Sequence, residues 1–149
     1  MGFSPLGLIV SVAVLAPSLL LIRHPPRDGL PDARPPRWLG VLERAGQALC
    51  LVMPVIVAPG RIAPWWSLAV ATAVIPYWAL WARYLRGGRT AELLYRPLWR
   101  VPVPMAVLPV LAFLAAGAWL ANPWIALAAL VLAAGHVPVS LIAARAVRA

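Results

Sequence analysis

The sequence predicts an all-α integral membrane bundle, and three features of its composition support this fold class. Hydrophobic residues make up 63% of the 149-residue chain and charged residues only 11%, whereas soluble domains are close to half apolar and a quarter charged. The mean hydropathy is +0.86. The apolar residues also fall into long runs, separated by segments that hold most of the arginines. Because the length allows one domain, residues 1–149 are expected to form a single transmembrane domain.

Five transmembrane helices are expected, because a spanning helix needs about 20 mainly apolar residues. Their approximate bounds are 5–22, 38–58, 64–82, 101–121 and 124–142. The first run has no basic segment before it and no clear cleavage site, so we interpret it as a retained helix and not a signal peptide.

The second helix is the most informative of the five. Its uncharged run, 45–58, would be about 21 Å long at roughly 1.5 Å per residue, which is shorter than a hydrocarbon core of about 30 Å. The helix therefore has to include residues 38–44, and this draws Glu43 into the membrane. A re-entrant or tilted short segment is the alternative.

The connections between the helices predict the orientation of the chain. Arginines occur in the loops 23–37 and 83–100 and after residue 142, whereas the opposite side carries only Arg61. Cytoplasmic loops carry the excess of basic residues, so the N-terminus is expected outside and the C-terminus in the cytoplasm.

A short interfacial helix is expected at 90–95, and Asn122-Pro123 is a typical helix start. The absence of lysine, with abundant Ala, Leu, Val and Pro, suggests a bacterial source and hence the bacterial inner membrane.

Several classes of function are not indicated by the sequence. The net charge of +9 would suggest nucleic acid on a soluble protein, but here the arginines separate apolar runs, so we interpret them as topology signals and contacts to membrane lipids. No phosphate-binding or dinucleotide glycine motif is present, and no cofactor is expected. Cys50 and Met53 share a helix face and could bind Cu(I), but packing explains them better, so no metal site is expected.

Glu43 and His136 are the two candidate catalytic residues. Glu43 shares one face of the second helix with Gln47 and Cys50, and a polar stripe on a membrane helix should face protein or water. His136 lies about 9 Å from the cytoplasmic end of the fifth helix and Glu43 about 7.5 Å inside the second, so they could meet if these helices touch. The alternatives are a Glu43–arginine ion pair at the interface and a neutral His136 bonded to a backbone carbonyl. Ser140, one turn from His136, would share its face.

The third helix carries a candidate ligand-binding surface. Tyr77, Trp81 and Tyr84 share one face and lead into Arg83 and Arg86. They form either an interfacial aromatic belt or a wall for an apolar ligand whose anionic head meets the arginines.

The segments LLYRPLWRVPVPMAVLPVL and GHVPVS, and more weakly LERAG in the second helix, resemble a group of small bacterial multi-pass membrane proteins with no assigned activity. The resemblance covers roughly the C-terminal half of the chain. It implies an intact bacterial membrane protein and implies that Glu43, Tyr95, Arg96, Pro97 and His136 are family features. It brings no catalytic residue with it.

Three functions remain open from the sequence. The first is binding or transport of a small amphipathic or lipid-like molecule in a cytoplasm-facing cavity. The second is an intramembrane enzyme on a lipid or isoprenoid substrate, with Glu43 and His136 as acid and base and loop arginines holding a polar head. The third is a structural or assembly subunit, in a homo-oligomer or a larger membrane complex. The candidate ligand-binding residues are Gln47, Tyr77, Trp81, Arg83, Tyr84, Arg86, Tyr95 and Arg96.

Overall fold

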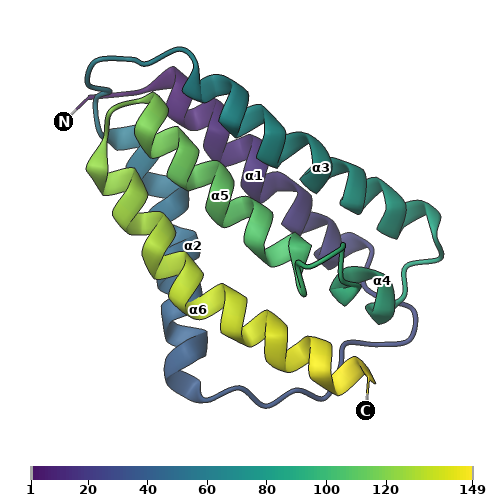
Figure 1. The fold of residues 1–149 in the computed structure, drawn as a ribbon. Coiled ribbons are helices and arrows are strands. Elements are labelled where there is room, and N and C mark those ends of the chain that lie inside the picture. Colours follow the sequence, from purple (N-terminus) through teal and green to yellow (C-terminus); the bar gives the residue numbers. More distant parts are fainter. Residues whose placement is uncertain (1, 149) are drawn as a thin grey trace.

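The computed structural model describes residues 2–148, and all regular structure in this part of the chain is helical apart from one isolated bridge between Leu98 and Val101 (Figure 1). The all-α class is therefore confirmed. The helices are α1 (Pro5–Arg23), α2 (Arg37–Ile56), α3 (Trp66–Arg86), α4 (Ala91–Tyr95), α5 (Pro104–Trp119) and α6 (Pro123–Arg148).

Local sequence signals explain where several helices begin. The Ser4 hydroxyl caps α1 by accepting a hydrogen bond from the Gly7 amide, with Pro5 at the first helical position. Thr90 caps α4 in the same way, and the short helix expected at 90–95 is confirmed. The Asn122 side chain accepts a hydrogen bond from the Trp124 amide at the start of α6.

The observed helix bounds differ most from the expected ones in α3, α5 and α6, and α2 ends at Ile56 and not at 58. Helices α3 and α6 extend past 82 and 142 to Arg86 and Arg148, because arginines continue a helix readily once it leaves an apolar run. Helix α5 is shorter than 101–121, because residues 98–101 form a tight turn with Trp99 at a positive φ of 53°. Four helices, α1, α2, α3 and α6, are long and apolar enough to cross a membrane, as expected of a multi-pass membrane protein, whereas α5 has 16 residues.

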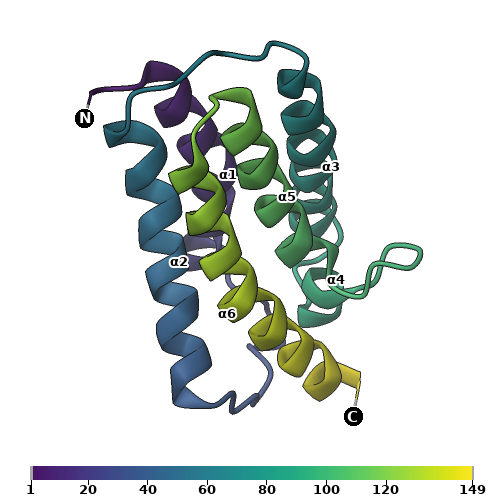
Figure 2. The same cartoon turned by 60° about the vertical axis from the view of Figure 1, so that its left-hand side comes forward.

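The long helices and α5 alternate in direction, so their connections gather at two ends of the bundle (Figures 1 and 2). At one end, backbone hydrogen bonds join Ser4 to Val55 and Gly60 to Leu120. At the other end, the Arg27 amide donates to the Arg89 carbonyl. This second end carries the arginine-rich loops.

Helix α5 lies at the centre of the bundle, between α1, α3 and α6 (Figure 2). Nine of its 16 residues are buried, and Phe113 is completely enclosed. Five of the nine buried residues are alanine or glycine, which lets neighbouring helices approach closely, as is usual for helix packing in membranes.

Helices α2 and α6 form the most extensive helix pair, and two glycines allow their close approach. A Cβ on Gly46 of α2 would overlap the Leu132 backbone of α6, and a Cβ on Gly135 of α6 would overlap the Glu43 backbone of α2. Only glycine fits at both positions without movement of a backbone. The crossing therefore lies directly beside Glu43 and His136.

Candidate functional site

Glu43 and His136 are in direct contact at the α2–α6 crossing. The distance from His136 Nδ1 to Glu43 Oε1 is 2.7 Å, and the two side chains are 24% and 21% exposed. They are 93 residues apart in the sequence, so only the packing of α2 against α6 brings them together. Gly135 precedes His136 and lies on the Glu43 backbone, which explains the short separation of the two side chains.

The contact determines which ring nitrogen of His136 remains free. When the Glu43 carboxylate is ionised it can only accept hydrogen bonds, and in that state Nδ1–H of His136 is the donor. In a neutral imidazole the lone pair is then on Nε2, which can accept a proton or a hydrogen bond. A carboxylate that orients an imidazole in this way is the arrangement used in general acid–base catalysis.

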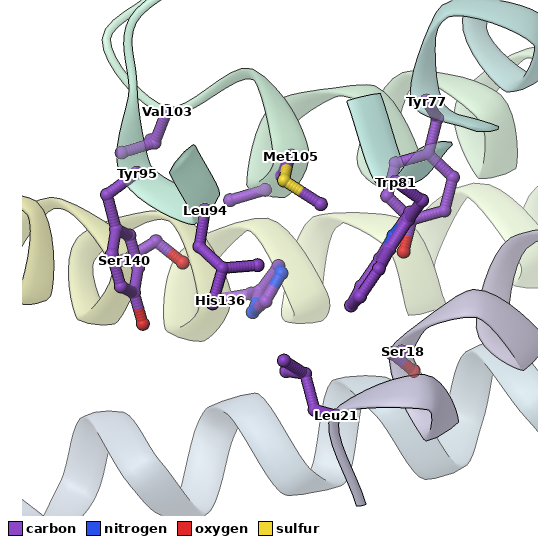
Figure 3. A pocket seen from close by; sticks show the side chains of 11 residues that line it. Ser18, Leu21, Tyr77, Trp81, Leu94, Tyr95, Val103, Met105, His136 and Ser140 are labelled. Carbon is purple, nitrogen blue, oxygen red and sulfur yellow. The ribbon is translucent and has the colours of Figure 1, made fainter. Parts of the chain in front are cut away.

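His136 also forms part of the wall of a cavity of about 100 Å³ within the bundle (Figure 3). The wall combines side chains from five helices, α1, α3, α4, α5 and α6. The predicted residues that line it are Tyr77, Trp81, Tyr95 and His136, and Ser140 joins them as expected from its spacing. Most of the remaining wall is apolar, which suits the non-polar part of an organic molecule.

Trp81 leaves a polar atom unused beside this cavity. The residue is only 4% exposed, and its Nε1–H makes no well-aligned hydrogen bond within residues 2–148, although the Tyr77 hydroxyl is close enough to interact with it. The ring meets Tyr77 edge-to-face at a centroid distance of 6.4 Å and Tyr84 at 5.6 Å, so both neighbours fix its orientation. A buried indole donor without a partner is unfavourable, and a bound group that accepts a hydrogen bond would remove this cost.

Tyr95 reaches the cavity from the short helix α4. Burial, and then the nearby Glu43 carboxylate, raise the pKa of the Tyr95 phenol above its ordinary value. The phenol therefore stays neutral and can donate a hydrogen bond at physiological pH. Asp28 supports this position from the 24–36 loop, because its carboxylate accepts a hydrogen bond from the Ala91 amide at the start of α4, at 2.8 Å.

The other predicted ligand-binding residues lie away from the cavity. Tyr84 is completely buried, and its hydroxyl donates to the His24 carbonyl at 2.8 Å, so it anchors the end of α1 to α3. Arg83 is half-buried and Arg86 is exposed, and neither lines the cavity. Gln47 lies in a separate groove of about 430 Å³ between α1 and α2. Arg96 lines a surface pocket of about 490 Å³ at the arginine-rich end of the bundle.

Six cavity residues were not singled out from the sequence. They are Ser18, Leu21, Leu94, Val103, Met105 and Ala106. Apart from Ser18 they are ordinary apolar residues of a membrane helix or a loop, and no local signal separates them from residues that face lipid. Their role depends on which helices surround them.

No group of three or more His, Cys, Asp or Glu side chains that could hold a metal ion occurs within the described residues. Cys50 is completely buried and belongs to the main apolar core cluster of the bundle. Comparison of the chain with protein-family models, with curated proteins and with solved structures finds no match. The Glu43–His136 contact and the cavity beside it are therefore the features of this chain that indicate a function.

Proposed function

We propose that this chain is a multi-pass membrane protein that binds a small amphipathic or lipid-like molecule in the cavity beside Glu43 and His136. The observation that carries the proposal is a mainly apolar cavity of about 100 Å³ with an orientated histidine and an unpaired indole donor in its wall. Such a combination of apolar wall and few polar groups is the usual form of a small-molecule site.

The proposal includes five membrane crossings, with the N-terminus outside and the C-terminus in the cytoplasm of a bacterial cell. The alternating direction of α1, α2, α3, α5 and α6 supports an odd number of crossings. Helix α5 is about 24 Å long at roughly 1.5 Å per residue, and residues 101–103 and 120–121 would complete its path across the bilayer. The arginine-rich end would then face the cytoplasm.

The size of the cavity limits which part of the ligand it holds. An engineered cavity of about 150 Å³ holds one benzene molecule, so this cavity suits a group of a few heavy atoms. The remainder of an amphipathic molecule would lie outside it, along the helices. We therefore expect the cavity to receive one end of the ligand.

Native mass spectrometry of the purified protein tests the binding proposal. A retained small molecule should be detected on the unmodified chain and lost from Ala106→Phe, which fills the cavity from a residue that is 3% exposed. Ala79→Phe is the matched control, because Ala79 lies exposed on α3 and the added ring leaves the cavity unchanged. Equal retention by both variants, with both correctly folded, would contradict the proposal.

The Glu43–His136 contact favours a second candidate, an intramembrane enzyme acting on a lipid or isoprenoid substrate. In this function His136 would act as the acid or base at Nε2, and Glu43 would orient it through Nδ1. Glu43→Gln should then lower turnover of a bound substrate by about 10²-fold or more while binding is retained. Loss of binding with unchanged turnover per bound molecule would favour the binding protein.

A further inference from the structure

The cavity contains two polar atoms that have opposite hydrogen-bonding needs. Trp81 Nε1–H is a donor only, and it is buried without a well-aligned partner within residues 2–148, with the Tyr77 hydroxyl as its one nearby acceptor. His136 Nε2 is the ring nitrogen left over from the Glu43 contact, and in the neutral ring it is an acceptor. The Trp81 and His136 rings both line the cavity, and the apolar side chains of Met105 and Leu21 lie beside them (Figure 3).

A hydroxylated head group would satisfy both needs, because a hydroxyl oxygen accepts one hydrogen bond and donates another. A carbonyl or ether oxygen could accept from Trp81 but would offer nothing to His136. The hydroxyls of Tyr77 and Tyr95 lie in the same wall and can adapt as donor or acceptor. The polar groups of the cavity are therefore matched to an uncharged alcohol.

An anionic head group fits this cavity poorly. Its wall contains no arginine within the described chain: Arg96 lies in the surface pocket, and Arg83 and Arg86 are elsewhere on α3. An ionised Glu43 beside a neutral His136 gives this part of the wall a net negative charge, which would repel a phosphate or carboxylate. Burial of an unpaired anion in an apolar wall also carries a large desolvation cost.

We propose that the end of the ligand that enters this cavity is an uncharged hydroxylated group, held by Trp81 Nε1–H as donor and His136 Nε2 as acceptor. This inference rests on the proposed binding function and specifies the chemical class of its ligand. It also separates the cavity from the arginines, which the sequence had suggested as partners of an anionic head.

The test compares three probes that share one saturated twelve-carbon chain: dodecanol, dodecanoate and dodecyl phosphate. Each is titrated into the full chain in nanodiscs at matched mole fractions, and bound copies are counted by native mass spectrometry. Binding that disappears in Ala106→Phe is assigned to the cavity, which removes surface adducts from the count. We expect dodecanol to bind the cavity at least about tenfold more tightly than dodecyl phosphate, a difference that corresponds to about 1.4 kcal/mol.

Trp81→Phe provides a second measurement that does not depend on filling the cavity. It removes the donor and retains most of the ring, so dodecanol affinity should fall about fivefold for the loss of one hydrogen bond. Trp99→Phe is the matched control, because Trp99 is 97% exposed in the 98–101 turn and its loss should leave the affinity unchanged.

The outcomes distinguish the two proposals. Preference for dodecanol that depends on Trp81 supports the inference. Cavity binding of dodecanoate or dodecyl phosphate as tight as that of dodecanol would overturn it and leave the binding function in place. Absence of cavity binding for all three probes would overturn the binding function and the inference together.

Discussion

Gly135 lies directly on the backbone of Glu43 where α6 crosses α2, and this contact places the neighbouring His136 within 2.7 Å of the Glu43 carboxylate. The side-chain pair is thus a consequence of a glycine-mediated helix crossing. Its geometry should be sensitive to small changes at residues that carry no chemistry themselves.

Gly135→Ala should weaken the bundle and separate Glu43 from His136. The added methyl group would overlap the Glu43 backbone, and overpacking of this kind typically costs about 1–3 kcal/mol. Gly40→Ala on α2 is the control, because a Cβ there meets nothing within 4 Å and the change should be neutral or slightly stabilising. Unfolding in mixed detergent micelles measures both. Equal stability of the two variants would show that the crossing tolerates a wider helix separation.

The Glu43–His136 pair should show energetic coupling. Glu43→Gln and His136→Ala each remove one partner from a partly buried hydrogen bond, and the double mutant should cost less than the sum of the single mutants. A coupling energy of about 0.5–3 kcal/mol is expected for residues in direct contact. The measurement is a double-mutant cycle on unfolding free energy, repeated on ligand binding. Additive effects in both cycles would mean that the contact has no energetic role.

Tyr95 should ionise at a higher pH than an ordinary tyrosine. Burial and the Glu43 carboxylate raise the pKa of its phenol above the usual value of about 10. Because the pKa is higher in the folded state, the associated stability is complete below pH about 10 and is lost as the pH rises through the folded pKa. The difference between absorbance titrations of the unmodified chain and Tyr95→Phe isolates this group from the other two tyrosines.

Glu43→Gln provides the control for the Tyr95 titration. Removal of the carboxylate charge should lower the Tyr95 pKa, and the remaining elevation reflects burial alone. A Tyr95 pKa that is unchanged by Glu43→Gln would contradict the proximity of the phenol to the carboxylate.

The five-span orientation predicts which connections lie in the cytoplasm. A reporter that is active only in the cytoplasm should work when fused after residue 149 or inserted within 83–100, and it should fail at Arg61. The reason is the distribution of arginines between the two ends of the bundle. Fusion after residue 121 serves as a second external control. Activity at Arg61 would exclude the proposed orientation.

The sequence alone was enough to predict much of the scaffold. Apolar runs of about 20 residues predicted five helices, of which four are long and apolar enough to span a membrane, and the Asn122-Pro123 pair indicated where α6 begins. These features are local, because helix formation and capping depend on residues within one or two turns. The similar depths of Glu43 and His136 also followed from the rise per residue of a helix.

The tertiary structure decided which of the polar residues meet. Helical periodicity places Glu43 and Gln47 on a similar face, but the rotation of α2 against α6 directs Glu43 to His136 and leaves Gln47 in the groove beside α1. Tyr84 shares a face with Tyr77 and Trp81, yet its hydroxyl is bonded to the His24 carbonyl. The cavity combines five helices, and the close approach that Gly46 and Gly135 permit sets the Glu43 contact of His136 in its wall. Contacts between distant segments are set by packing across the whole bundle, and no local pattern in the sequence encodes them.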